Sequence, residues 1–301
     1  MLDASQFVDF ACSLADAARA ETLVYFRTNT HVTNKLATVL KQRSDRTSKD
    51  VLKQRSDRTS KNTLKQRSDR ANKDQNFDPV TAADRAAEQV IRNLIQAQFP
   101  DHGIRGEEFD DHPACSEYTW VIDPIDGTRA FISGLPVWGI LIGLLCKDTP
   151  LIGVMDQPLT GERFVGGPHG AFLQHHGQQT PMRVRTCPEL KLATLCTTDP
   201  YLFVGPEAQA FAHLRQQTRL QRYGLDCYGY SALALGGIDL VVESGLQDYD
   251  ICALIPVVKA AGGQITSWSG KDASKGGQVI ASGDARVHAQ VLEILTPFAK
   301  D

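Results

Sequence analysis

Hydrophobic residues recur at helical spacing in several stretches of the chain. Over residues 5–26 they return every three or four positions, which predicts an N-terminal helix with one buried face. A second helix is predicted to begin at Thr81-Ala-Ala-Asp84, which resembles a capping box, and to end before Pro100. Further helices are predicted over residues 207–217, 249–261 and 285–299.

Short apolar runs separated by Gly, Pro and Asp predict strands, mostly in the middle of the chain. They cover residues 118–122, 137–146, 151–155, 163–165, 171–174, 182–185 and 240–243, with two more short strands before the last helix. The glycine-rich stretch 165–170 lacks the Lys-Ser/Thr of a phosphate loop and predicts a β-turn. Blocks of strands flanked by helices indicate a layered α+β or α/β fold.

A basic tandem repeat interrupts this pattern. Residues 40–75 contain three copies of a twelve-residue unit that begins Leu-Lys-Gln-Arg-Ser-Asp-Arg, with 12 Lys/Arg against 5 Asp. Each copy starts with one large apolar residue, so a helix built from it has no apolar stripe to bury. We therefore expect a solvated, mobile insertion. A short charged helix and a contact with nucleic acid or another polyanion are the alternatives.

Composition narrows the class of protein. With 301 residues, 42% hydrophobic and 22% charged, and a net charge of -3, the chain is neither a disordered polymer, a collagen-like fibre nor a disulfide mini-protein. No apolar run approaches the roughly 18 residues of a membrane helix. The N-terminus lacks the features of a signal peptide, so a cytoplasmic protein is expected. The seven scattered cysteines form no Cys-x-x-Cys pair and are expected to be reduced thiols.

The candidate chemistry lies in four acidic clusters, at residues 78–84, 106–108, 123–128 and 248–250. Asp123 and Asp126 follow an apolar strand, where a sequence normally turns with one Asp or Gly. Acidic residues in loops are often helix caps or face water. Carboxylates that converge at strand ends repel one another unless a cation is present, and hard cations such as Mg²⁺ take oxygen ligands. The clusters therefore indicate a multi-metal site for a phosphate group.

The order and spacing of these clusters resemble the inositol monophosphatase family of Mg²⁺-dependent, lithium-sensitive phosphatases. The resemblance is carried by Asp84, Glu107-Glu108, Asp123-Pro-Ile-Asp-Gly-Thr128, Tyr249-Asp250 and Ala261-Gly-Gly263. It covers nearly the whole chain except the repeats, which lie where the family has a short loop. The runs 126–138, 154–158 and 228–230 are similar to the histidinol-phosphatase branch.

The resemblance implies a layered αβαβα sandwich and a homodimer without membrane contact. Residues 1–301 would form one phosphatase unit, with a metal-site half over about 1–185 and a substrate half over about 186–301. The implied ligands of two or three Mg²⁺ ions are Glu107, Asp123, Asp126, Asp250 and the backbone carbonyl of Ile125. Four carboxylates balance two Mg²⁺ ions, so a phosphate dianion is not repelled by the acidic protein.

The resemblance also implies catalytic roles. One metal would lower the pKa of a bound water, and Thr128 and Asp84, together with Glu107, would complete the catalytic group. Backbone N–H groups of Gly127 and Thr128 would contact phosphate oxygens. No Cys-x5-Arg cradle or Gly-x-Ser-x-Gly elbow supports a covalent nucleophile. The family's mobile-loop lysine stays unassigned among Lys35, Lys73 and the repeat lysines.

L-Histidinol phosphate is the expected substrate, with inositol phosphate, nucleotide 3'-phosphate and sugar phosphate as alternatives. The resemblance places Glu243 where the leaving group is held and Asp226 near the same pocket, and Arg129 is expected to contact substrate as well. Two carboxylates suit the ammonium and imidazole of histidinol phosphate, whereas inositol offers neutral hydroxyls. The alternatives are that Asp226 is a surface or turn residue, or that the protein binds polyanions through its repeats.

Overall fold

The structure is a computed structural model that describes residues 4–28, 33–34, 79–80 and 82–300. The chain forms two compact units, of which the smaller spans residues 30–82. In that unit β1 (Thr33–Asn34) pairs with β2 (Pro79–Val80) in antiparallel register. Several features predicted from the sequence lie outside the described residues: the repeats at 40–75, Asp78, Thr81, Lys35 and Lys73.

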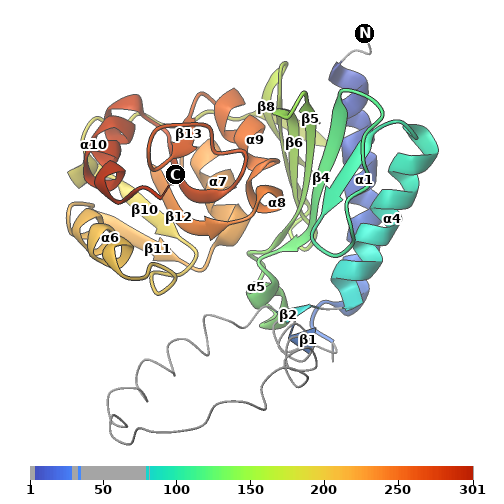
Figure 1. The fold of residues 1–301 in the computed structure, drawn as a ribbon, viewed down its shortest axis with the longest axis horizontal. Coiled ribbons are helices and arrows are strands. Elements are labelled where there is room, and N and C mark those ends of the chain that lie inside the picture. The colour runs from blue at the N-terminus through green and yellow to red at the C-terminus, as the bar shows by residue number, and fades with distance from the viewer. Residues whose placement is uncertain (1–3, 29–32, 35–78, 81, 301) are drawn as a thin grey trace, which may run out of the picture. The chain divides into compact units, whose positions relative to one another are not determined.

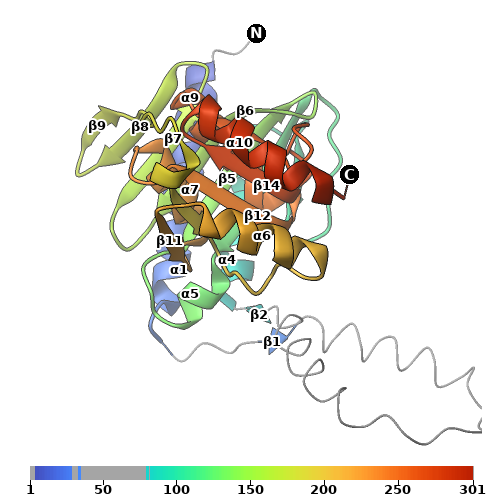
Figure 2. The same ribbon diagram turned by 90° about the vertical axis from the view of Figure 1, so that its left-hand side faces the viewer.

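In the described part of the larger unit, helices and sheets stack in five layers (Figure 1). A helix pair covers a larger sheet, a middle group of helices separates it from a smaller sheet, and a second helix pair covers that sheet and lies in front in Figure 2. The outer pairs are α1 (Ala4–Tyr25) with α4 (Ala82–Gln98), and α6 (Pro206–Gln216) with α10 (Ala285–Leu295). The middle helices are α7 (Asp226–Ala234), α8 (Asp248–Ile251) and α9 (Leu254–Ala260). This order confirms the predicted αβαβα sandwich.

The larger sheet, in sequential strand order, is antiparallel except for the parallel pair β3·β4. Its strands are β3 (Gly103–Gly106), β4 (Tyr118–Asp126), β5 (Gly139–Cys146), β6 (Thr149–Gln157), β7 (Glu162–Gly167), β8 (Gly170–His175) and β9 (Gln178–Pro181). The β4·β5 register shifts between Asp123 and Asp126, and the short helix α5 (Thr128–Ile132) follows at once. The chain therefore changes direction at the end of β4, where both carboxylates lie.

The smaller sheet has the order β11-β10-β12-β14-β13. Its strands are β10 (Thr194–Thr197), β11 (Leu220–Tyr223), β12 (Leu240–Leu246), β13 (Gln264–Ser267) and β14 (Gly277–Ser282). Strand β10 is parallel to both β11 and β12, and β14 is antiparallel to its neighbours. The loops after β10 and β11 and the residues around Glu243 on β12 thus come to the same end of this sheet.

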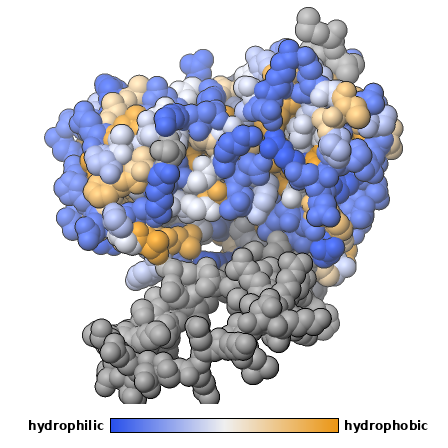
Figure 3. All heavy atoms as spheres, in the orientation of Figure 1, coloured by the Kyte–Doolittle hydropathy of each residue, from blue (hydrophilic) through white to orange (hydrophobic). Residues whose placement is uncertain are grey.

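Alternating residues of the central strands face different helical layers. On β12, Leu240 and Val242 pack with the α6 and α10 layer, whereas Val241 packs with α7 and α9. On β5, Ile140 and Ile142 likewise belong to the core beneath α1. Because helices cover both faces of the larger sheet at β5, this central strand is a continuous apolar run. The face shown in Figure 3 is accordingly mostly hydrophilic, with hydrophobic residues in small separate areas.

Most predicted elements are confirmed, but two are wrong. Residues 182–185 form no strand: Met182 is buried, and Val184 donates its N–H to the Ala261 carbonyl at the end of α9. The predicted helix 249–261 is two helices, α8 and α9. Pro256 lacks the N–H that would continue the helical hydrogen bonds across this break.

Other elements were missed or continue differently. The short strands β3, β9, β10 and β11 and the helix α7 were not predicted, because four to nine residues carry too little periodicity to be recognised. The predicted terminal helix is α10 followed by a 3-10 turn, Thr296–Phe298. A second such turn, Leu190–Leu192, precedes β10.

Helix α9 lies directly on the larger sheet at two glycines that face each other across β6 and β7. Gly153 and Gly166 are register partners. A Cβ atom on Gly153 would lie 1.8 Å from the Ala253 carbonyl oxygen, and one on Gly166 would lie 2.3 Å from the Val257 Cα. Only glycine allows this approach, which holds α9, and the α8 turn before it, against the sheet.

We expect Gly166→Ala to lower the free energy of unfolding by about 2 kcal/mol or more, because the added methyl group overlaps backbone that cannot move independently. Its neighbour Gly167 is the matched control. A Cβ atom there meets nothing closer than 3.5 Å, so Gly167→Ala should change stability by less than about 0.5 kcal/mol. Urea unfolding of both variants measures the difference. Equal losses in the two variants would contradict the proposed close packing of α9.

Candidate active site

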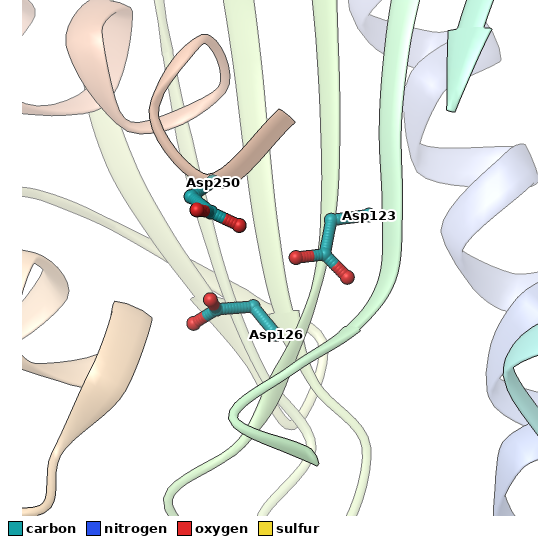
Figure 4. A group of neighbouring side chains, drawn as sticks. All are labelled: Asp123, Asp126 and Asp250. Carbon is teal, nitrogen blue, oxygen red and sulfur yellow. The ribbon is translucent and has the colours of Figure 1, made fainter. Parts of the chain in front are cut away.

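Three carboxylates from distant parts of the chain meet at the end of β4. Asp123 and Asp126 come from β4 and Asp250 from α8, and one oxygen of each lies within 4.8 Å of the others. Figure 4 shows the three side chains projecting into a common space between the strand and the helix. Asp123 is buried, at 2% exposure, and the other two are partly buried.

Backbone N–H groups hold each carboxylate in place. Asp123 accepts from the N–H of Ile125 at 3.1 Å, within the bulge of β4. Asp126 accepts from the N–H of Cys227 in α7 at 2.7 Å. Asp250 accepts from the N–H of Gln247 at 2.6 Å, in a capping box at the start of α8. Backbone groups of a strand, a helix and a loop therefore help to orient the three carboxylates.

The electrostatics of this cluster favour a cation. Burial, and then the charges of Glu107 and Asp126, raise the pKa of Asp123 well above its ordinary value. Burial and the charge of Asp226 do the same for the pKa of Asp126. The pKa of Asp250 is raised to about 7, chiefly by burial. Carboxylates in this state are stabilised by a hard cation, whose positive charge reverses each of these shifts.

Two further predicted residues lie beside the cluster. Glu107 follows β3, is partly buried, and its charge raises the pKa values of Asp123 and Asp250. Asp84 lies in the first turn of α4, is 1% exposed, and its charge also raises the pKa of Asp123. The fold thus brings together carboxylates from all the acidic clusters of the sequence that it describes.

The turn after β4 is shaped by Gly127. Gly127 has a φ of +85°, a left-handed conformation that favours glycine, and it precedes α5. The Thr128 hydroxyl donates to the Ile125 carbonyl at 3.1 Å. Ile125 is fully buried, and its carbonyl accepts this hydrogen bond within the turn.

Asp226 lies at the start of α7 and faces this turn. A Cβ atom on Gly127 would be 3.1 Å from Asp226 Oδ2, so the carboxylate packs directly against the glycine. Burial raises the pKa of Asp226 to about 6, while the charge of Arg129 and a hydrogen bond from the Thr198 side chain oppose that rise. The fold therefore places Asp226 beside the cluster and not in a remote turn.

Glu243 lies on β12, close to Asp226. It is 2% exposed and accepts hydrogen bonds from the Thr197 hydroxyl at 3.1 Å and the Thr198 N–H at 2.6 Å. Burial raises its pKa to about 8, and the charge of Asp226 adds to that rise. Arg129, in α5, is about half exposed and pairs with Asp199.

Sequence reasoning missed Cys227, Thr198 and Asp199. Each touches a predicted residue only because β10 and α7 bring distant segments to the end of β4. Only their positions in the sequence could have indicated a role in the site. Cys227 directly follows Asp226, and Thr198-Asp199 ends a short apolar run.

The comparison with known families agrees with this geometry. Residues 5–297 match the model of the inositol monophosphatase family. The chain belongs to the inositol monophosphatase family. It is a phosphatase that acts on phosphate monoesters, and enzymes of this family depend on metal ions. Among the helices that the structure describes, none has the length and hydrophobicity needed to span a membrane.

Similar proteins carry two kinds of name. The chloroplastic bifunctional phosphatase IMPL2 of Arabidopsis thaliana is 42% identical over 231 residues, which cover 73% of this chain and 66% of that protein. A histidinol-phosphatase of Chlorobaculum parvum is 37% identical over 206 residues, covering 68% and 78% of the two chains. An inositol monophosphatase structure from Zymomonas mobilis superimposes with a TM-score of 0.74, at 32% identity over 98% of this chain and 99% of that one. The histidinol-phosphatase branch is therefore supported, and the substrate is a separate question.

We expect Asp123→Asn to weaken Mg²⁺ binding by about tenfold or more and to lower phosphatase turnover by orders of magnitude, because one of the charges facing the cations is lost. The metal-free variant should be at least as stable as the wild type, since mutual repulsion falls. Calorimetric titration with Mg²⁺, a phosphate-release assay and thermal unfolding in EDTA measure these three effects. Glu293→Gln, on the exposed face of α10, is the control. Unchanged Mg²⁺ affinity in Asp123→Asn would contradict the assignment.

Glu243 should make the metal-free protein less stable as the pH rises. Its pKa is raised from 4.5 to about 8 on folding, so its stabilising contribution is present below about 4.5 and is lost as the pH rises through about 8. Glu243→Gln has no such titration. The wild type should therefore lose up to about a few kcal/mol relative to this variant between pH 5 and pH 8. Guanidinium unfolding in EDTA tests this, and a difference that does not change with pH would refute it.

Proposed function

We propose that the chain is a Mg²⁺-dependent phosphomonoesterase that hydrolyses L-histidinol phosphate to L-histidinol and phosphate, a step of histidine biosynthesis. The observation that carries this proposal is the position of Asp226, packed against Gly127 beside the acidic cluster. A second carboxylate, Glu243, lies close to it. Relatives named histidinol-phosphatase support the same substrate.

The donor set fits hard divalent cations. Buried carboxylates with raised pKa values and a backbone carbonyl offer only oxygen ligands, the type that Mg²⁺ prefers. Two or three ions would be held by Glu107, Asp123, Asp126, Asp250 and the Ile125 carbonyl. When bound, these ions supply positive charge for the phosphate and for the departing oxygen, and they acidify water.

The remaining residues of the site act on water and phosphate. We assign Thr128 and Asp84 to the orientation of the attacking water, with Asp84 accepting its proton. The N–H groups of Gly127 and Thr128 are assigned to phosphate oxygens. Water attacks phosphorus, the bond from phosphorus to the histidinol oxygen breaks, and that oxygen takes up a proton. Glu107, which would also hold a metal ion, completes the catalytic group.

The leaving group carries the specificity in this proposal. L-Histidinol has an ammonium group and a protonatable imidazole, which offset the desolvation of Asp226 and Glu243. The neutral hydroxyls of inositol do not. Arg129 borders the same pocket, and we assign it to substrate recognition through these carboxylates.

Hydrolysis of inositol 1-phosphate is the second candidate, favoured by the 32% identity to a solved inositol monophosphatase over nearly the whole chain. A nucleotide 3'-phosphatase is a third. We also propose a homodimer and inhibition by lithium, on the ground of family membership. In each case the two halves, about 1–185 and 186–301, would work as one unit, because Asp250 from the second half completes the ligand set of the first.

Phosphate release from four substrates, with and without Mg²⁺, tests the proposed function. L-Histidinol phosphate should give the highest kcat/KM among histidinol, inositol, nucleotide 3'- and sugar phosphates, and EDTA should abolish turnover. Asp226→Asn should raise KM for L-histidinol phosphate more than about tenfold, about 1.4 kcal/mol, with a much smaller change for a neutral aryl phosphate.

Three outcomes would count against this proposal. Faster hydrolysis of inositol phosphate by the unmodified protein would overturn the histidinol assignment. Equal losses of Asp226→Asn on both substrates would mean that Asp226 supports the metal site or the fold. Full activity in EDTA would refute the metal requirement.

A further inference from the structure

One guanidinium group lies among the carboxylates of the proposed leaving-group pocket. Arg129 Nη1 is 3.6 Å from Asp199 Oδ2, and the charge of Arg129 also acts on Asp226. Arg129 belongs to α5, after the larger sheet's strand β4, whereas Asp199 follows β10 of the smaller sheet. The ion pair therefore joins the two sheets across the pocket.

The segment after β10 links all three carboxylates of the pocket. Thr198 donates its N–H to Glu243, and its side chain hydrogen-bonds Asp226. The next residue, Asp199, accepts a hydrogen bond at Oδ1 from the N–H of Tyr201, at 2.9 Å. Its other oxygen, Oδ2, faces Arg129. Asp199 is thus an ordered carboxylate with one oxygen directed at a cation.

The pair between Arg129 and Asp199 is weak enough to exchange. At 3.6 Å, with side chains 45% and 34% exposed, it is screened by water and ions. Arg185 and Asp239 show the contrast: they form two hydrogen bonds of 2.6 and 2.5 Å, and the Asp239 side chain is 1% exposed. A cation that enters the pocket can compete with Arg129 for Asp199. It could not displace an arginine that is bound as tightly as Arg185 is to Asp239.

We propose that Arg129 is an internal counter-cation of the leaving-group pocket, which a cationic leaving group displaces from Asp199, so that Asp199 becomes a third carboxylate that selects cationic substrates. This inference rests on the proposed function and deepens it. Before substrate binds, Arg129 compensates the clustered carboxylates. After binding, the positive charge of the substrate's ammonium or imidazolium compensates these carboxylates in place of Arg129. A neutral leaving group has no charge with which to displace Arg129.

The two partners should then have opposite effects. Asp199→Asn removes a carboxylate from the pocket and should weaken the binding of a cationic alcohol. Arg129→Gln removes the competing cation and should strengthen it. An Arg129 that instead contacts the phosphate group would leave the affinity for the free alcohol unchanged. The sign of the change in Arg129→Gln therefore decides between the two roles.

Calorimetric binding of L-histidinol to the full-length, Mg²⁺-loaded protein at pH 8 and low salt measures these effects without turnover. We expect Kd to rise about threefold or more in Asp199→Asn and to fall about threefold or more in Arg129→Gln, with Arg129→Lys close to the wild type. The neutral analogue 4-(3-hydroxypropyl)imidazole should show neither shift, because its imidazole is mostly uncharged at this pH. High salt should reduce all the differences.

Matched controls come from an exposed ion pair at the opposite end of β4. Lys147 and Glu117 are 2.8 Å apart, with side chains 70% and 57% exposed. Glu117→Gln and Lys147→Gln change the net charge by the same amounts as the test variants, and their Kd values should stay within about twofold of the wild type.

Two kinds of failure can be told apart. If L-histidinol phosphate is hydrolysed but Arg129→Gln weakens or does not change L-histidinol binding, the counter-cation role is overturned and the proposed function stands. The same holds if Asp199→Asn leaves Kd unchanged. If the unmodified protein neither hydrolyses L-histidinol phosphate nor binds L-histidinol, the proposed function fails, and this inference with it.

Discussion

Repulsion between buried carboxylates is the constraint around which the site is built. Asp123, Asp126 and Asp250 would separate if their backbones were free, yet one oxygen of each lies within 4.8 Å of the others. They stay together because rigid elements hold them: a bulged strand carries two, and a helix packed on the sheet carries the third. The packing of the layers offsets the unfavourable free energy of this repulsion. A bound cation would remove the repulsion.

The close packing of α9 against the larger sheet makes this possible. Gly153 and Gly166 let the α9 backbone lie on the strands, and α8 with Asp250 immediately precedes that helix. The start of α7 is tied to the same place by the hydrogen bond from the Cys227 N–H to Asp126. Elements from both sheets therefore converge at the end of β4, and the proposed metal ligands and leaving-group residues become neighbours.

Charge is graded across the resulting pocket. The proposed metal side holds Asp123, Asp126 and Asp250, whose charges a bound cation would compensate, whereas the proposed leaving-group side already contains Arg129 opposite Asp199 and Asp226. A phosphate ester with a cationic leaving group matches both sides, because its phosphate needs the metal charge and its leaving group needs the carboxylates. In the proposed exchange, the substrate's cation replaces Arg129 beside these carboxylates. The site therefore selects substrates with a cationic leaving group.

The sequence by itself determined the family and most of the layers. Helical and strand periodicity predicted α1, α4 and β4 to β8, since long amphipathic or buried segments leave a repeated pattern. The order and spacing of the acidic clusters, together with Ala261-Gly-Gly263, carried the family resemblance. Sequence periodicity did not predict the short or interrupted elements. The break between α8 and α9, the strand β10 and the partners Thr198 and Asp199 were decided only by tertiary structure, because a residue that acts through a neighbour distant in the chain leaves no local pattern.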